Sequence, residues 1–192
     1  EIASCLVGSE MCIRDRFKGI SPSLGQRVYV DKLATVIGNV KLGDDVSIWP
    51  GAVVRGDMHE ITIGKRTCIQ DNAVLHITHA SDYNKNGWPL KIGSSVIVGH
   101  GVILHGCTIM DEVLIGNGAI INDGAIVNSQ VIVGAGTLVP PSKSLDSGYV
   151  YVGNPCKKLR PITTKERDFF LYSTSNYVKL KDEYIKEFNS CF

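Results

Sequence analysis

Aliphatic residues recur at every sixth position along most of the chain, and a small or β-branched residue follows most of them after four further positions. A period of six fits neither the 3.6-residue turn of an α-helix nor the strict alternation of a hairpin strand. Six-residue repeats are typical of parallel β-helices. The pattern therefore predicts an all-β solenoid. Its seventeen repeat positions are Val30, Val36, Leu42, Ile48, Val54, Ile63, Ile69, Leu75, Ile92, Val98, Leu104, Ile109, Ile115, Ile121, Val127, Val133 and Val139.

The longest break in this period holds eleven extra residues between Leu75 and Ile92, and its many Asn, Asp, Lys, Gly and Pro residues predict a loop at 77–91. With three repeats in each coil, Val54, Leu75 and Leu104 fall on one face of successive coils. The residues directly after them then form a column with the strand spacing of about 4.8 Å. This column consists of Arg55, His76 and His105.

The same count aligns Ile69 with Val98 on the preceding face, which places Asp71 beneath His100. His100 therefore belongs to a different face from His76 and His105. Two histidines at the strand spacing can share one metal ion. If three solenoids pack side by side, His100 of one subunit can meet the histidine pair of another.

The two ends of the chain lie outside the repeats. Residues 17–148 are predicted to form the solenoid, and residues 149–192 a linker and a C-terminal α-helix. Thr163 and Glu166 form a capping box, and aromatic residues at 170, 177 and 184 predict a helix face that packs against the solenoid or a neighbouring subunit. Residues 1–16 contain no repeat, and the letters VGSEMCIRD resemble a translated sequencing adapter, so this segment is left unassigned.

Composition narrows the possible partners. A chain of 192 residues with 44% hydrophobic residues can bury the core of one domain, and its formal net charge of +1 provides no general attraction to nucleic acid or to an anionic bilayer. No apolar run approaches the roughly 20 residues that span a membrane. Six cysteines without paired spacing indicate reduced thiols. The expectation is a soluble, cytoplasmic protein without nucleic-acid or membrane partners.

The segments VVRGD, IQDNAVLHITH and VGHGVILHG resemble the gamma-class carbonic anhydrase family, and within it the short bacterial carbonic anhydrase-like hexapeptide-repeat proteins. The resemblance runs from Phe17 to about Tyr184. It implies a left-handed parallel β-helix, a homotrimer, and a metal ion at each subunit interface, normally Zn²⁺, with Fe²⁺ or Co²⁺ as alternatives. It also implies His76, His100 and His105 as metal ligands and Arg55, Asp57, Gln70 and Asp71 as further catalytic residues.

This ligand set implies reversible hydration of CO2 to bicarbonate. Three neutral imidazoles leave one position of a zinc ion open for water, and the metal lowers the pKa of that water from about 15.7 to near 7, giving a metal-bound hydroxide. Gln70 is expected to orient this hydroxide. Arg55 is expected to bind bicarbonate or to pair with a carboxylate such as Asp57 across the interface.

Two positions depart from the pattern of the best characterised members, which carry Glu for proton shuttling where this chain has Met58 and His79. A histidine, with a reference pKa of about 6.5, can relay protons, whereas methionine cannot. His79 is therefore the expected relay, and turnover is expected to be weak. Two other functions remain open: a non-catalytic metal-binding trimer that acts as a scaffold or small-anion binder, and a hexapeptide acyltransferase with one histidine as general base and no metal.

Overall fold

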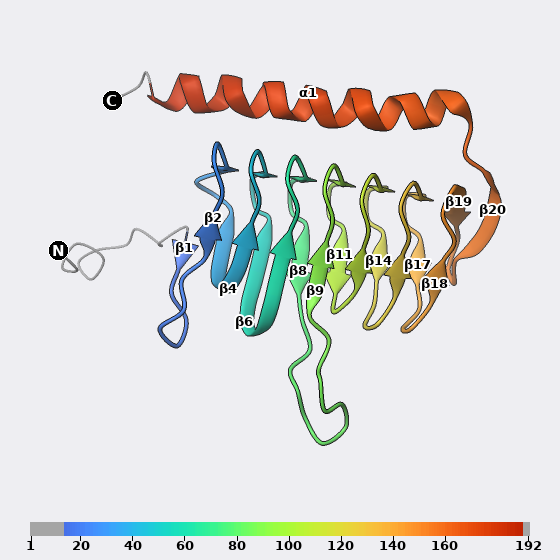
Figure 1. The fold of residues 1–192 in the computed structure, drawn as a ribbon, viewed down its shortest axis with the longest axis horizontal. Coiled ribbons are helices and arrows are strands. Elements are labelled where there is room, and N and C mark those ends of the chain that lie inside the picture. The colour runs from blue at the N-terminus through green and yellow to red at the C-terminus, as the bar shows by residue number, and fades with distance from the viewer. Residues whose placement is uncertain (1–13, 190–192) are drawn as a thin grey trace.

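The computed structural model describes residues 14–189, which form a parallel β-solenoid of about seven coils with one long helix beside it (Figure 1). The predicted fold class is confirmed, because short parallel strands repeat with each coil and a single helix, α1 (Thr164–Asn189), follows them. Within these residues no helix is long and apolar enough to cross a bilayer.

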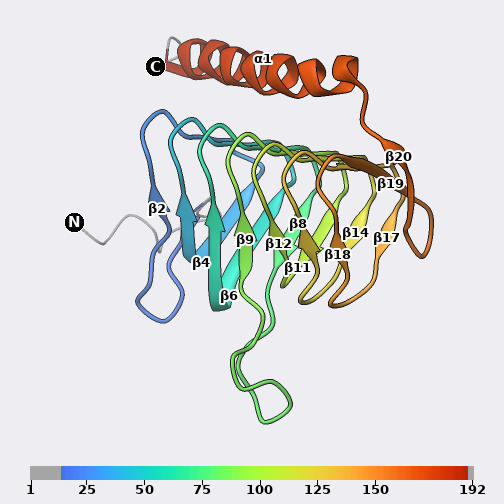
Figure 2. The same ribbon diagram turned by 45° about the vertical axis from the view of Figure 1, so that its right-hand side comes forward.

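The first face of the solenoid lies beneath helix α1 (Figure 2). Its strands pair in parallel register, one from each coil. They are β3 (Tyr29–Val30), β5 (Ser47–Ile48), β7 (Cys68–Ile69), β10 (Ile97–Val98), β13 (Leu114–Ile115), β16 (Ile132–Val133) and β19 (Tyr149–Val152).

The second and third faces share two long strands, β4 (Thr35–Leu42) and β6 (Val53–Ile63), which continue from one face to the next. The remaining strands of the second face are β1 (Arg14–Asp15), β8 (Val74–His76), β11 (Ile103–His105), β14 (Ile120–Ile121) and β17 (Leu138–Val139). Those of the third face are β2 (Ser23–Leu24), β9 (Leu90–Ile92), β12 (Thr108–Ile109), β15 (Ile126–Val127) and β18 (Ser144–Leu145).

The repeat positions form stacked ladders inside the solenoid. Val54 pairs with Leu75, and Leu75 pairs with Leu104, as the repeat count predicts. All three side chains are fully buried. Burying an aliphatic side chain of this size contributes about 1.5 to 3 kcal/mol, so ladders of this kind fix the register of every coil. The same ladders fix which polar residues meet at the corners.

Helix α1 begins with the predicted capping box, in which the Thr163 amide donates to Glu166 at 2.8 Å and the Glu166 amide donates to the Thr163 hydroxyl at 3.2 Å. The predicted aromatic stripe packs on the solenoid. Phe170 is buried near the last coils, whereas Tyr177 and Tyr184 contact Trp49 near the first coils. The helix therefore runs back along the whole first face.

Three predicted boundaries need correction. Residues 14 and 15 form β1 and pair with Val36 and Ile37, so they belong to the sheet, while residues 1–13 lie outside the described residues. The solenoid extends beyond 148, because β19 pairs with β16 before β20 (Lys157–Pro161) turns back antiparallel. The loop is shorter than predicted, since β9 starts at Leu90.

Candidate metal centre

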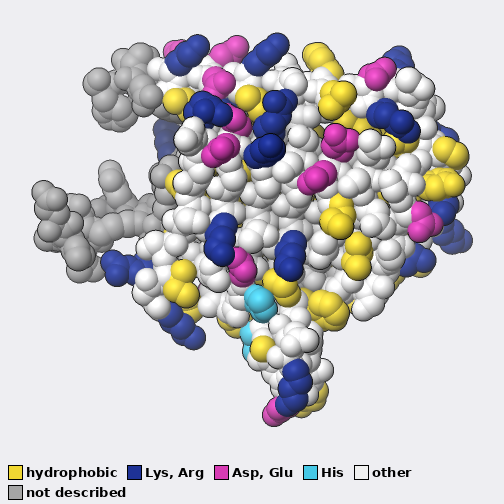
Figure 3. Space-filling view, in the orientation of Figure 1, with side chains coloured by type: hydrophobic (Ala, Val, Ile, Leu, Met, Phe, Trp, Pro, Cys, Tyr) yellow, Lys and Arg dark blue, Asp and Glu magenta, His cyan; other side chains and the backbone are white. Residues whose placement is uncertain are grey.

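His76 and His105 lie side by side at the corner where the second face ends. They occupy paired positions in β8 and β11, and their ring centroids are 5.2 Å apart. The predicted histidine column is therefore confirmed. His76 Nδ1 lies 3.2 Å from His105 Nε2. In Figure 3 the visible histidine side chains lie where the long loop leaves the solenoid.

The outer nitrogen of each ring is held by a carboxylate. His76 Nε2 lies 3.1 Å from Asp57 Oδ1, and His105 Nδ1 lies 2.8 Å from Asp123 Oδ1. An ionised carboxylate only accepts hydrogen bonds, so these two nitrogens carry the ring protons. In the neutral rings the two nitrogens that face one another, His76 Nδ1 and His105 Nε2, are then both lone-pair acceptors.

Two lone pairs at 3.2 Å repel unless a proton or a metal ion lies between them. Burial lowers the pKa of His76, and the charges of Arg55 and His105 lower it further against the hydrogen bond to Asp57, which favours the neutral ring. Two nitrogen ligands of a tetrahedral zinc ion, each about 2.0 to 2.1 Å from it, lie about 3.3 Å apart. The pair therefore fits a divalent metal ion.

Asp57 bridges the histidine pair and Arg55. Burial opposes its ionisation, but hydrogen bonds from His76 and Arg55 outweigh burial and hold the pKa of Asp57 below its usual value. Arg55 Nη1 donates to Asp57 Oδ2 within the same chain. The expected pairing of Arg55 with Asp57 across an interface is therefore corrected, because the two side chains are two residues apart on β6 and already in contact.

His100 stands at the opposite corner of the second face. Its Nδ1 lies 3.0 Å from Asp71 Oδ2, so the predicted stacking of Asp71 and His100 is confirmed. Gln70, next to Asp71, is buried, and its amide nitrogen donates to the hydroxyl of Tyr177 on helix α1. Tyr177 was not singled out from the sequence as a neighbour of Gln70, because the repeat count does not place the helix.

Between these two corners the second face presents an exposed apolar surface, here called the apolar face. Its outward side chains pair from coil to coil, and Val74 and Ile103 at its centre are 40% and 38% exposed. The side chains are Val53, Val74, Ile103, Ile120 and Leu138. The His76–His105 pair borders one edge and His100 the other. Among residues 14–189, no three His, Cys, Asp or Glu side chains of one chain gather closely enough to hold a metal.

Asp123 is a site residue that the sequence analysis missed. It follows His105 by one coil of eighteen residues, and this offset was the available signal. Its second oxygen accepts a hydrogen bond from the Thr78 hydroxyl at 2.9 Å, which ties the first residues of the long loop to His105. A Cβ on Gly106 would lie 2.2 Å from Asp123 Oδ1, so only glycine leaves room for this contact.

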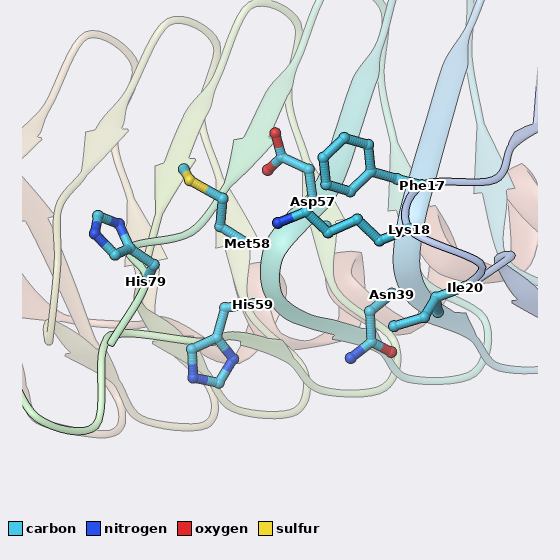
Figure 4. Close-up of a pocket in the computed structure, with 9 residues that line it drawn as sticks. Phe17, Lys18, Ile20, Asn39, Asp57, Met58, His59 and His79 are labelled. Carbon is cyan, nitrogen blue, oxygen red and sulfur yellow. The ribbon is translucent and has the colours of Figure 1, made fainter. Parts of the chain in front are cut away.

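The two departures from the family pattern lie together. Met58 and His79 line one cavity with Asp57, Met58 from β6 and His79 from the loop (Figure 4). Both side chains are exposed. His79 therefore lies close to the candidate centre, but it is not one of the three histidines that bond a carboxylate.

If Asp123 positions His105, the Asp123→Ala variant should bind Zn²⁺ or Co²⁺ about 10- to 100-fold more weakly. Removing a carboxylate that orients a metal-binding histidine typically lowers metal affinity by this factor. Asp123→Asn keeps an acceptor for the His105 N–H and should lose less. The measurement is a metal competition titration with a chromophoric chelator. Asp111→Ala is the matched control, since Asp111 accepts a hydrogen bond from the Ser94 amide at another corner. Equal affinity in both alanine variants would contradict this role.

Comparisons with known proteins place the chain in a family of hexapeptide-repeat proteins. Residues 21–56 match the family model described as bacterial transferase hexapeptide (six repeats). Protein YrdA of Escherichia coli is 53% identical over 90% of this chain and 94% of its own length. Gamma carbonic anhydrase 2, a mitochondrial protein of Arabidopsis thaliana, is 38% identical over 90% of this chain, which spans 62% of that protein.

A crystal structure of a hexapeptide transferase family protein from Anaplasma phagocytophilum superimposes with a TM-score of 0.83 at 34% identity, covering 90% of this chain and 98% of the other. The solenoid, its repeats and these relatives lead to one assignment. The chain belongs to the gamma carbonic anhydrase-like family of hexapeptide-repeat proteins.

Proposed function

We propose that the protein is a metal-dependent carbonic anhydrase that interconverts CO2 and bicarbonate at sites shared between the subunits of a homotrimer. The metal is Zn²⁺, with Fe²⁺ or Co²⁺ as alternatives, since all three accept imidazole nitrogen ligands. The observation that carries the proposal is that His76, His100 and His105 each bond a carboxylate, namely Asp57, Asp71 and Asp123. Histidines that bind metals usually donate their other N–H in this way.

The position of the three histidines supports a shared site. His76 and His105 border one edge of the apolar face, and His100 borders the other. A ring of three subunits brings one edge of each subunit to the opposite edge of the next, because cyclic contacts join two different surfaces. Such a ring would also cover the apolar face, which is the second reason to favour it.

In the proposed centre, the bound metal would lower the pKa of water and so make a nucleophile available near neutral pH. The chain's own residues would bind the metal ion and orient the groups around it. Asp57, Asp71 and Asp123 fix the ring orientations of the three histidines. Gln70 donates to Tyr177 through its amide nitrogen, so its carbonyl oxygen can accept a hydrogen bond from water.

Arg55 provides the positive charge for the product. One of its N–H groups is used by Asp57, and its side chain is 42% exposed, so other N–H groups can donate to bicarbonate. As water adds to CO2, one proton must leave. We propose that His79 accepts this proton and passes it to solvent from the root of the loop.

The test is metal analysis together with stopped-flow CO2 hydration on one anaerobically purified sample. We expect about one metal ion per chain and measurable hydration. His105→Ala should lose most of both, whereas His59→Ala should keep both, because His59 bonds the Asn86 carbonyl and the Glu60 amide instead of a metal-facing neighbour. Hydration that is absent with several metals would reject the enzyme and leave a metal-binding scaffold.

An acyltransferase is the alternative enzyme that must be distinguished from a carbonic anhydrase. Such an enzyme needs one histidine as general base and no metal. If the chain transfers an acetyl group from acetyl-CoA after treatment with a chelator, and does not hydrate CO2 after metal is restored, the carbonic anhydrase proposal fails. If chelation abolishes hydration and metal restores it, the acyltransferase is rejected.

A further inference from the structure

A cavity of about 440 Å³ opens beside Asp57, at the first coils of the solenoid (Figure 4). Cavities that hold small organic molecules measure about 300 to 1,000 Å³. A three-atom substrate such as CO2 does not need this volume. The cavity therefore provides space for a larger ligand.

The wall of the cavity is partly apolar. Phe17, Ile20 and Met58 line it and are 37%, 49% and 47% exposed. Single exposed hydrophobic side chains are common, but three around one cavity form a surface that an apolar chain would cover. The ligand should therefore have an apolar portion.

Two polar side chains of the cavity, Asp57 and His59, already have hydrogen-bond partners within the chain. Among the described residues that line the cavity, Asp57 is the only carboxylate, and both of its oxygens are engaged, one by His76 and the other by Arg55. His59 is also engaged, since its Nδ1 accepts from the Glu60 amide and its Nε2 bonds the Asn86 carbonyl.

Lys18 remains available as a cation. It forms no ion pair with any residue that the structure describes, and its Nζ lies 5.3 Å from the centre of the Phe17 ring. Figure 4 shows Lys18 and Phe17 on one side of the cavity, His79 on the other, and Met58 between them. A charged group at Lys18 would thus place an attached chain along the apolar wall.

We propose that this cavity binds a small organic monocarboxylate, with its carboxylate paired to Lys18 and its apolar chain against Ile20 and Met58. The carboxylate gains a charge-assisted hydrogen bond, and the chain removes apolar surface from water. A neutral ligand with the same chain would leave Lys18 without its partner. A very short carboxylate would leave the apolar wall uncovered.

Hexanoate is the probe, and acetate and 1-hexanol are its controls. The full chain is used after removal of metal with a chelator, so that the carboxylate cannot bind a metal ion. The methionine methyl groups are labelled with ¹³C. The sequence contains three methionines, and Met110, 44% exposed, is an internal reference because it does not line the cavity.

Hexanoate should shift the Met58 methyl signal saturably and leave Met110 unchanged. Acetate and 1-hexanol should each bind about tenfold more weakly, and Lys18→Met should weaken hexanoate binding by a similar factor, whereas Lys18→Arg should retain it. Met58→Glu should abolish binding by adding a negative charge to the wall, with hexanoate then followed by calorimetry.

Three results would overturn the proposal: equal shifts at Met58 and Met110, equal affinity for hexanoate and 1-hexanol, or wild-type affinity in Lys18→Met. Because the measurement uses metal-free protein, it does not depend on carbonic anhydrase activity. A protein that binds hexanoate but does not hydrate CO2 would support the monocarboxylate site and reject the carbonic anhydrase proposal. A protein that hydrates CO2 but does not bind hexanoate would support the carbonic anhydrase proposal and reject the monocarboxylate site.

Discussion

Mixing a His100→Ala chain with a His105→Ala chain should restore metal binding that neither variant has alone. In the proposed trimer each site takes His100 from one subunit and the His76–His105 pair from the next. A mixed trimer therefore contains one interface with all three histidines intact. Random association of equal amounts should recover about one quarter of the wild-type metal content, since each oriented interface has one chance in about four of joining the two intact edges.

The experiment is co-refolding of two differently tagged chains, followed by mass analysis of the mixed trimers and metal measurement. A mixture of His76→Ala and His105→Ala chains is the matched control. Both substitutions lie on the same edge, in paired strands β8 and β11, so no interface in that mixture is complete. Verified mixed trimers of His100→Ala and His105→Ala without metal would place all three ligands on one chain and contradict the shared site.

The sequence allowed the register of the site to be predicted because the six-residue repeat continues on both sides of the long loop. Once Leu75 and Leu104 stack in the interior, the residues after them must be neighbours, and His76 and His105 are paired. The capping box of the helix was predictable for the same reason, since its two residues interact across one turn. These contacts depend on spacing along the chain and on little else.

The carboxylate partner of His105 could not be assigned in this way. Asp123 lies one coil away, but its side chain reaches His105 only because Gly106 leaves space and Thr78 from the loop holds its other oxygen. Loop geometry does not follow the repeat. Likewise, the contact between Gln70 and Tyr177 depends on where helix α1 lies, which the repeat does not determine.

The apolar face needed the three-dimensional register as well. The sequence analysis counted the inward positions of each repeat, whereas Val74 and Ile103 point outward one residue earlier. Their significance comes from stacking in a continuous row on a face that helix α1 does not cover. On the first face, by contrast, the outward side chain of Ile97 is buried beneath the helix.

Replacing Ile103 with aspartate should dissociate the proposed trimer and remove most of the metal that its shared sites would hold, without unfolding the solenoid. Ile103 lies at the centre of the apolar face, in the same coil as both His100 and His105. A charge enclosed in an apolar interface without a partner costs several kcal/mol, and a ring of three subunits encloses it three times. Separating the subunits then separates His100 from the histidine pair.

Ile126→Asp is the matched control. Ile126 points outward from β15 on the third face and is 42% exposed, compared with 38% for Ile103. Light scattering should find a monomer for Ile103→Asp and a trimer for Ile126→Asp, with native circular dichroism for both. If Ile103→Asp remains a trimer with full metal content, the apolar face is not the surface that joins the subunits. The Ile103 side chain points away from the core, so the substitution should leave the solenoid itself unchanged. If Ile103→Asp becomes a monomer that still binds metal through His76, His100 and His105, the site does not need a second subunit.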